Sequence, residues 1–449
     1  MGRSMEWHKL LSHNRLRRPS AVLEKGRSPF QQDIDRITFS AAFRRLAYKT
    51  QVHPLSPNDH VHTRLTHSIE VACVGRSLGT GVGAEIAAEI EEIDECLKIT
   101  QDTFGYVVQA ACLAHDIGNP PFGHFGEYAM RSWFEKNAKP CSRLAVKLDD
   151  VRQEDFTLFD GNAQGFRIIT QLEDAKWAGG LQLTHAVLGT FTKYPRASNI
   201  IKDNYIGGEK PGFLKSEEHY FVEIAEQLGL EQRENRYWSR HPLAFLVEAA
   251  DDICYKIIDI EDGYELGYLS FSEAKEILGS IASKDSDLTT LPAKESDQIG
   301  KLRAVAVGIL VKECITIFLQ NKQEILSGSF NKPLIELTKF NDQIKTASKA
   351  AQTKIFESET ITKREIAGEK IIQGLLDMFA DVCVNLVNKD FEIEKLKKKE
   401  RRLARLIGDD SILRANTMYD ALLCMTDFVS GMTDRFAVET FRQLTGIST

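Results

Sequence analysis

Histidine residues are concentrated in one short part of the chain. Six of the eleven histidines lie between positions 53 and 124 of the 449 residues. His115 is followed directly by Asp116, and His124 precedes Glu127 by three positions, so that one helical turn would place these two on the same face. Imidazole and carboxylate groups bind divalent metal ions and carry protons in catalysis. This clustering predicts a metal-binding or acid–base site.

The helix that leads to His115 is predicted by an apolar run. Residues 107–114 are apolar apart from one glutamine, and a glycine and two prolines follow within six positions of His115, which ends the helix. Neighbouring residues diverge by about 100° on a helix, so His115 and Asp116 can share one ion only with ligands from other elements. His67, in a helical pattern, and Asp251, a carboxylate between apolar stripes that needs a partner, are the candidates. Taken alone, His115 and Asp116 could also be a structural pair at a helix end.

Apolar residues recur at helical spacing along most of the chain, which predicts an all-α fold with at most a minor β-hairpin. Residues 48–55 or 156–159 are the candidates for that hairpin. We expect irregular structure at 161–165, 204–214 and 283–296, where glycine, proline and small polar residues gather. The expected organisation is a basic N-terminal segment at 1–35, a catalytic core at 36–282 and a helical C-terminal region at 297–449.

Charge and composition limit the protein class. The chain has 43% hydrophobic and 27% charged residues, as in soluble globular proteins, and a net charge of -7. Residues 1–50 hold 11 Lys/Arg against 4 Asp/Glu, which favours either a polyanion contact or a solvated basic surface. No apolar run reaches the roughly 18 to 20 residues needed to span a bilayer, and residues 1–20 lack the apolar stretch and small-residue cleavage site of a secretory signal, so we expect a cytoplasmic protein without a membrane contact. Eight scattered cysteines without a CxxC pair predict neither disulfides nor a thiolate zinc site.

Eight ordered sequence blocks resemble one known family. The chain resembles the bacterial dGTP triphosphohydrolases, which belong to the HD superfamily of metal-dependent phosphohydrolases. The blocks extend over nearly the whole chain, from about residue 36 to 442. They are residues 43–46 (FRRL), 49–52 (KTQV), 63–68 (TRLTHS), 115–124 (HDIGNPPFGH), 161–165 (GNAQG), 192–195 (TKYP), 249–253 (AADDI) and 431–435 (GMTDR).

The resemblance implies an HD-domain helical core and a reaction. A deoxynucleoside triphosphate is hydrolysed at the α-phosphorus, and deoxynucleoside and tripolyphosphate are released. It also implies a divalent ion held by four ligands that leave room for water and substrate, with Mn²⁺ or Mg²⁺ expected first and Fe²⁺, Ni²⁺ or Zn²⁺ as alternatives. These ligands are His67, His115, Asp116 and Asp251.

By the same resemblance, His124 is the catalytic histidine and Glu127 is its orienting partner. The alternative for His124 is a histidine that binds substrate or supports the site without transferring a proton. A carboxylate beside an imidazole fixes its tautomer and supports its protonated form, which suits a general acid or base near neutral pH.

Further residues are assigned to the substrate. A triphosphate carries about four negative charges at neutral pH, so the pocket needs cations. Related enzymes bind phosphate at the positions of Arg64 and Lys193, and Tyr255 lies one turn after Asp251, where it could bind phosphate or sugar. The alternatives are a surface ion pair for the cations and a core position for the tyrosine.

The resemblance also assigns sugar and base contacts. Gln51 would bind the sugar 3′-hydroxyl, and Val52 would exclude a 2′-hydroxyl. Glu365 resembles a position that reads guanine, although a charge on a helix surface is an equal interpretation. Gln51 could instead cap a turn.

The resemblance implies three partners: a dNTP substrate with dGTP preferred, further copies of the chain in a homo-oligomer that is often a hexamer, and single-stranded DNA. Two alternatives stay open. One is another HD-type phosphohydrolase with a nucleoside monophosphate or alarmone substrate. The other is a nucleic-acid-binding regulatory protein with a vestigial site, which the basic N-terminal segment suggests.

Overall fold

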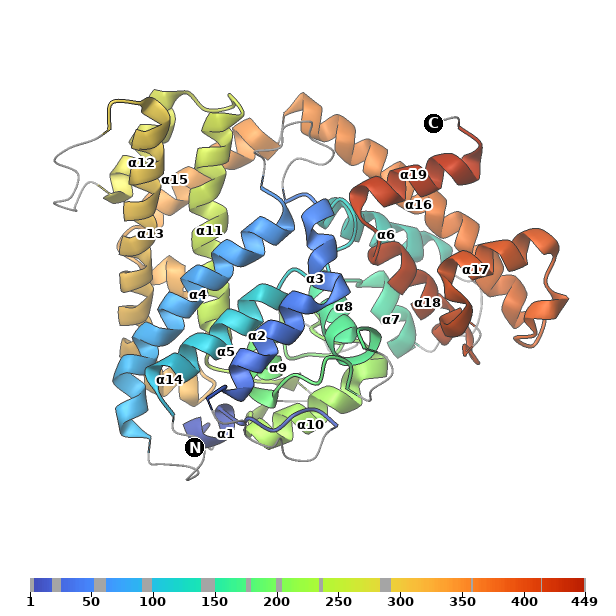
Figure 1. Cartoon of the computed structure of the whole chain (residues 1–449), viewed down its shortest axis with the longest axis horizontal. Coiled ribbons are helices and arrows are strands. Elements are labelled where there is room, and N and C mark those ends of the chain that lie inside the picture. The colour runs from blue at the N-terminus through green and yellow to red at the C-terminus, as the bar shows by residue number, and fades with distance from the viewer. Residues whose placement is uncertain are drawn as a thin grey trace.

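The computed structural model of the chain describes residues 4–17, 26–51, 62–90, 99–138, 150–174, 179–198, 204–233, 237–282, 292–356, 358–412 and 414–447. Within these ranges the regular structure is helical, which confirms the all-α prediction (Figure 1). One short antiparallel sheet pairs strand β1 (Gln232–Arg233) with strand β2 (Tyr237–Trp238). In the same ranges, no helix combines the length and the apolar character needed to cross a membrane.

Three helices at the centre of the molecule carry the predicted metal ligands. Helix α4 (Arg64–Ile86) packs closely on helix α5 (Gln101–Ala114), and helix α11 (Ala244–Glu265) packs against both. Glycines at the α4–α5 contact make the close approach possible, because a Cβ at Gly79 or Gly83 would lie 2.7 or 2.8 Å from carbonyl oxygens of α5. These glycines therefore set the distance between α4, which carries His67, and α5, which ends at His115.

Local sequence signals set the ends of these helices. Helix α4 begins at Arg64 because the Thr63 hydroxyl accepts a hydrogen bond from the backbone N–H of Thr66, and the Thr66 side chain accepts from Thr63. Helix α5 ends at Ala114, and His115 is its C-terminal cap, as the sequence predicts.

The remaining helices surround this centre. On one side of α11, at the left of Figure 1, lie α12 (Phe271–Ala282), α13 (Glu295–Gln320), α14 (Lys322–Leu326) and α15 (Asn341–Ala351). On the opposite side of the molecule lie α6 (His124–Asn137), α7 (Asp150–Thr157), α16 (Glu359–Val387), α17 (Lys398–Ile412), α18 (Met418–Ser430) and α19 (Asp434–Thr445). The other helices are α1 (Trp7–Leu10), α2 (Pro29–Phe39), α3 (Ala41–Arg45), α8 (Gly161–Arg167), α9 (His185–Phe191) and α10 (Glu218–Leu228). Short 3-10 and π turns connect them: η1 (Leu46–Tyr48), η2 (Ala87–Glu89), η3 (Ile168–Leu172), η4 (Ile206–Gly208), η5 (Lys215–Glu217), η7 (Leu334–Leu337), η8 (Gln352–Phe356) and η9 (Ile393–Lys395).

Buried apolar side chains form two large clusters. The first extends in sequence from Met5 to Ala347, and the second from Phe122 to Ala437. The expected division into segments 1–35, 36–282 and 297–449 stays a prediction. The N-terminal segment contributes to the first cluster through Met5, Leu10, Leu11, Leu16 and Phe30.

Two local predictions are wrong. Residues 156–159 form no hairpin strand, because Phe156 lies at the end of helix α7 and stacks on Phe134 with 4.9 Å between ring centroids. Residues 161–165 are helical rather than irregular, since they begin α8. The glycines there serve close packing: a Cβ at Gly161 would come within 2.9 Å of the Glu127 carboxylate. Of the other hairpin candidate, residues 48–51 form no strand and residues 52–55 lie outside the described ranges.

Candidate active site

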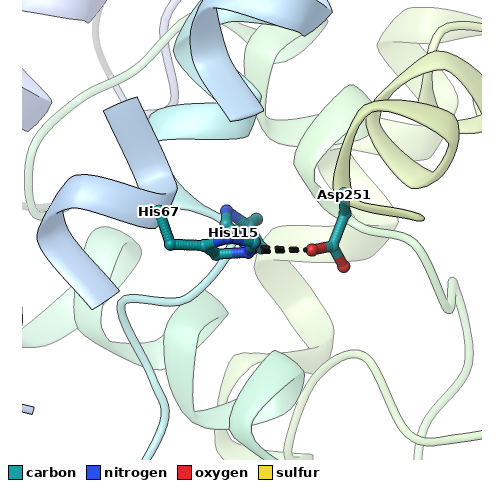
Figure 2. Close-up of side chains that lie close together, drawn as sticks. All are labelled: His67, His115 and Asp251. Atoms are coloured by element: carbon teal, nitrogen blue, oxygen red, sulfur yellow. Dashed lines mark hydrogen bonds and ion pairs between the residues drawn. The ribbon is translucent and has the colours of Figure 1, made fainter. Parts of the chain in front are cut away.

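Three side chains from the central helices meet in one group. His67 on α4, His115 at the end of α5 and Asp251 on α11 each offer one ligand atom, and these atoms lie within 4.8 Å of one another (Figure 2). Nε2 of His67 is 3.1 Å from Oδ1 of Asp251, and Nε2 of His115 is 3.6 Å from the same oxygen. Among the described residues this is the one group of three or more His, Cys, Asp or Glu residues with that spacing.

The tautomer of His115 follows from its neighbours. Its Nδ1 lies 2.7 Å from the carbonyl oxygen of Cys112, which can only accept, so Nδ1 carries the hydrogen. Its Nε2 is buried without a hydrogen-bond partner among the described residues and lies 3.5 Å from Asp116 Oδ1 and 3.6 Å from Asp251 Oδ1. The Nε2 lone pair and the two carboxylate oxygens that it faces repel one another. A cation bound between the nitrogen and these oxygens would remove this repulsion. The donor set of imidazole nitrogens and carboxylate oxygens fits a divalent metal ion.

Asp116 lies at the edge of this group. Its Oδ2 accepts from Nη1 of Arg64 at 2.7 Å, and its Oδ1 accepts from the Asn119 side chain. Burial opposes ionisation of Asp116, but the Arg64 guanidinium together with His115 and His67 lowers the pKa of the carboxyl group. Burial also opposes ionisation of Asp251, whose pKa is nevertheless lowered because His115 and His67 lie beside it. Both carboxylates are thus available as anionic ligands.

His124 and Glu127 form the predicted pair in the first turn of α6. Nδ1 of His124 lies 2.9 Å from Oε2 of Glu127, and 71% of the histidine side chain is exposed. Glu127 is buried, and its other oxygen accepts from the backbone N–H of Gly161 at 2.7 Å. Burial opposes ionisation of Glu127, but the hydrogen bond from His124 is among the interactions that lower its pKa. A carboxylate therefore holds the hydrogen of His124 on Nδ1 and leaves Nε2 available for proton transfer.

A cavity of about 590 Å³ joins these groups. Phe191 and Val247 of the first apolar cluster and Phe122 of the second line it, so the cavity lies where the two clusters meet. His67 does not line the cavity and is 4% exposed. Val52 lies outside the described residues. The other predicted site residues all line the cavity: Gln51, Arg64, His115, Asp116, His124, Glu127, Lys193, Asp251, Tyr255 and Glu365.

The cations of the cavity are held by carboxylates. Lys193 Nζ lies 3.1 Å from Glu248 Oε1, and the buried Arg240 donates to the other oxygen of Glu248 at 2.8 Å. Lys210 also lines the cavity, with its Nζ 3.4 Å from Asp160 Oδ2. Lys210 was not predicted from the sequence, because it lies in a glycine- and proline-rich segment without a periodic pattern.

Gln51 and Glu365, the predicted sugar and base contacts, both line the cavity. The side-chain oxygen of Gln51 is buried and has no hydrogen-bond partner among the described residues. Glu365 is half-buried, and burial raises the pKa of its carboxyl group. Asp259, two turns after Asp251 on α11, is a buried carboxyl group that does not line the cavity, and its Oδ2 likewise lacks a partner in the described part of the chain. Its only sequence signal is a charge among the apolar residues of α11.

Comparison with known proteins defines first the class and then the family. Residues 64–172 match the HD domain, and this range contains His67, His115, Asp116, His124 and Glu127 but not Asp251. A "deoxyguanosinetriphosphate triphosphohydrolase-like protein" of Synechocystis sp. is 41% identical over 99% of this chain and 100% of its own length, and one of Pseudomonas aeruginosa is 40% identical over 99% of each. The "deoxyguanosinetriphosphate triphosphohydrolase" of Salmonella typhimurium is 31% identical over 98% of each chain. The chain belongs to the deoxyguanosinetriphosphate triphosphohydrolase-like family of HD-domain enzymes.

Proposed function

We propose that this chain hydrolyses deoxynucleoside triphosphates, with dGTP preferred, to deoxynucleoside and tripolyphosphate. The observation that carries the proposal is that one cavity brings the metal-ligand group together with the His124–Glu127 pair and with three cations. Family membership supports the same substrate class, since relatives that match over their full length are named for dGTP.

A divalent ion would be held by His67, His115, Asp116 and Asp251, with Mn²⁺ or Mg²⁺ proposed over Fe²⁺, Ni²⁺ and Zn²⁺. The proposal is supported by the His115 Nε2 lone pair that faces carboxylate oxygens of Asp116 and Asp251. When bound, such an ion supplies Lewis-acid polarisation of a phosphate oxygen. Asp116 is proposed as the fourth ligand because its Oδ1 is the atom turned toward His115, while its Oδ2 stays on Arg64.

The protein residues would supply the proton transfer and the phosphate contacts. Water adds to the α-phosphorus, the bond from phosphorus to the sugar 5′ oxygen breaks, and that oxygen takes a proton. His124, oriented by Glu127, acts as the general acid or base because its side chain opens into the cavity. Arg64, Lys193 and Lys210 contact the phosphate oxygens.

Sugar and base contacts would come from other residues of the cavity lining and from Val52. The side-chain oxygen of Gln51, which has no partner in the described ranges, accepts from the 3′-hydroxyl, and Val52 stands against C2′. Tyr255 lies on the cavity wall one turn after Asp251, where it could contact phosphate or sugar. Glu365, as a carboxylate, accepts from N1–H and N2–H of guanine.

The test is product analysis. Purified protein is incubated with dGTP and Mn²⁺, and the products are separated by anion-exchange chromatography, with EDTA-treated protein and Asp251→Ala as controls. Deoxyguanosine and tripolyphosphate in equal amounts are expected only with wild type and metal. Pyrophosphate or orthophosphate as the first product would instead assign another HD-type phosphohydrolase reaction, and no product from any of the four dNTPs would favour a regulatory protein.

A further inference from the structure

A buried carboxylate from the C-terminal part of the chain connects two walls of the cavity. Asp434, the first residue of α19, is 2% exposed and accepts three hydrogen bonds. Its Oδ2 accepts from the backbone N–H of Thr50 at 3.1 Å and from the Thr50 hydroxyl at 2.5 Å, and its Oδ1 accepts from the backbone N–H of Phe122 at 2.9 Å. Thr50 and Phe122 both line the cavity. The two oxygens of the Asp434 carboxylate thus bind two different segments of the cavity lining.

Each of these two segments leads directly to a site residue. Thr50 precedes Gln51, whose side-chain oxygen has no hydrogen-bond partner among the described residues. Phe122 has a φ of +64°, which is unfavourable for a residue with a Cβ, and the chain then passes through Gly123 to His124 at the start of α6. Because the Phe122 N–H is bound to Asp434, the carboxylate stabilises the turn that places His124.

A second buried side chain also links the segment before Gln51 to the segment before His124. Lys49, next to Thr50, donates from Nζ to the carbonyl oxygen of Ser430 at 2.8 Å and to that of Asn119 at 2.5 Å. Residues 430–434 therefore join the segment before Gln51 to the segment before His124 through side chains that are themselves buried.

We propose that Asp434 is a positioning residue that fixes the sugar-binding segment at Gln51 relative to the proton-transfer residue His124. A sugar that fits against Gln51 would then be held at the correct distance from His124, and a sugar that does not fit would be held poorly. The inference rests on the proposed function. It predicts that Asp434 affects selection between deoxyribose and ribose, although it lies outside the cavity lining.

The test compares Asp434→Asn with Thr433→Ala. An asparagine keeps the shape but has one acceptor oxygen, so its NH₂ group must face one of the backbone N–H groups that Asp434 bound. Thr433→Ala removes the N-terminal cap of α19, a 3.2 Å hydrogen bond from Phe436 N, and leaves the Asp434 contacts in place. It is therefore a matched control for loss of stability at the same corner.

We expect kcat/KM for dGTP to fall about ten- to a hundredfold in Asp434→Asn, the usual effect of losing a buried hydrogen bond to a charged group. The value for GTP should fall much less, so the dGTP to GTP ratio drops at least about fivefold, while bound metal per chain is unchanged. In Thr433→Ala the ratio should stay at the wild-type value even if the melting temperature falls. An equal loss for both nucleotides in Asp434→Asn would overturn the inference and leave a structural role.

A second pair of variants decides the question if Asp434→Asn does not fold. Thr50→Val removes the hydroxyl donor to Asp434, and Thr50→Ser keeps it. The inference is supported if the dGTP to GTP ratio of kcat/KM is lower in Thr50→Val and has the wild-type value in Thr50→Ser. A wild-type ratio in Thr50→Val contradicts it. Wild-type protein that releases no tripolyphosphate would refute the proposed function itself, which separates the two failures.

Discussion

Replacing Glu127 by glutamine tests how the proposed proton carrier is oriented. In the structure, one oxygen of Glu127 accepts from Gly161 N at 2.7 Å and the other from His124 Nδ1 at 2.9 Å. Glutamine has one such oxygen. If it stays on the Gly161 N–H, the NH₂ group faces Nδ1 of His124, so Nδ1 must become the acceptor and the hydrogen must move to Nε2.

The expected loss can be bounded from these contacts. A hydrogen bond to a charged group contributes about 1.5 to 3 kcal/mol, which at about 1.4 kcal/mol per decade corresponds to one to two decades in rate. The whole contribution of a proton-transfer residue is about two to four decades, which is the loss that we expect for His124→Ala. Glu127→Gln should therefore lower kcat for dGTP by about ten- to a hundredfold and by no more than His124→Ala does.

The assay is steady-state release of tripolyphosphate from dGTP, with metal content measured on the same preparations. We expect KM within about threefold of wild type, and a full equivalent of metal, because Glu127 touches none of the proposed ligands. Glu135→Gln, an exposed carboxylate on the same helix, is the matched control and should be fully active. A wild-type kcat in Glu127→Gln would refute the reasoning, and a loss of metal in either Glu127→Gln or His124→Ala would make the pair part of the metal site.

Three further predictions concern other parts of the site. Asp251→Ala should lose both bound metal and turnover, because it removes a charge and a ligand; elemental analysis that finds a full equivalent of metal in an active variant would contradict this. Gln51→Ala should lose about 1 to 3 kcal/mol of transition-state binding for dGTP and narrow the dGTP to GTP ratio, measured as kcat/KM for both nucleotides; an unchanged ratio would mean that the sugar is read elsewhere. Hydrogen bonds from His62 to Asp262 and Glu70 raise the pKa of His62 to about 10, so its stabilising effect is complete below about pH 6.5 and is lost as pH rises through about 10. Denaturant titrations should show that the excess in free energy of unfolding of wild type over His62→Gln shrinks by up to about 1.4 kcal/mol per pH unit in that window. The comparison with the variant is needed because burial lowers the pKa of Lys49 to about 7, and the contribution of Lys49 to stability therefore changes with pH in the opposite direction.

The parts of the fold that sequence could predict depend on short-range signals. The end of α5 at His115 follows from a glycine and two prolines, and the His124–Glu127 pair follows from a spacing of three in one helical turn. The helicity of residues 161–165 could not be predicted, because their glycines are required by close contacts with distant segments and not by a turn. Asp434 and Lys210 were missed as site residues for a similar reason: their roles come from contacts with residues far away in sequence.

Glu248 and Asp160, the carboxylates beside Lys193 and Lys210, were not predicted from the sequence, yet they help to determine how the cavity would receive a polyphosphate. Arg64, Lys193 and Lys210 are each held by a carboxylate, and the Arg64 Nε is buried without a partner among the described residues. A lysine has three donors and an arginine five, so these ion pairs fix the side chains and leave other donors for phosphate oxygens. Because the cations are ordered before substrate arrives, less side-chain entropy is lost on binding. The carboxylates reduce the net positive charge, however, so the three cations cannot balance a triphosphate with about four negative charges by themselves. A divalent ion at the His67–His115–Asp251 group would supply the charge that the cations lack, which is why substrate binding and metal binding should depend on each other.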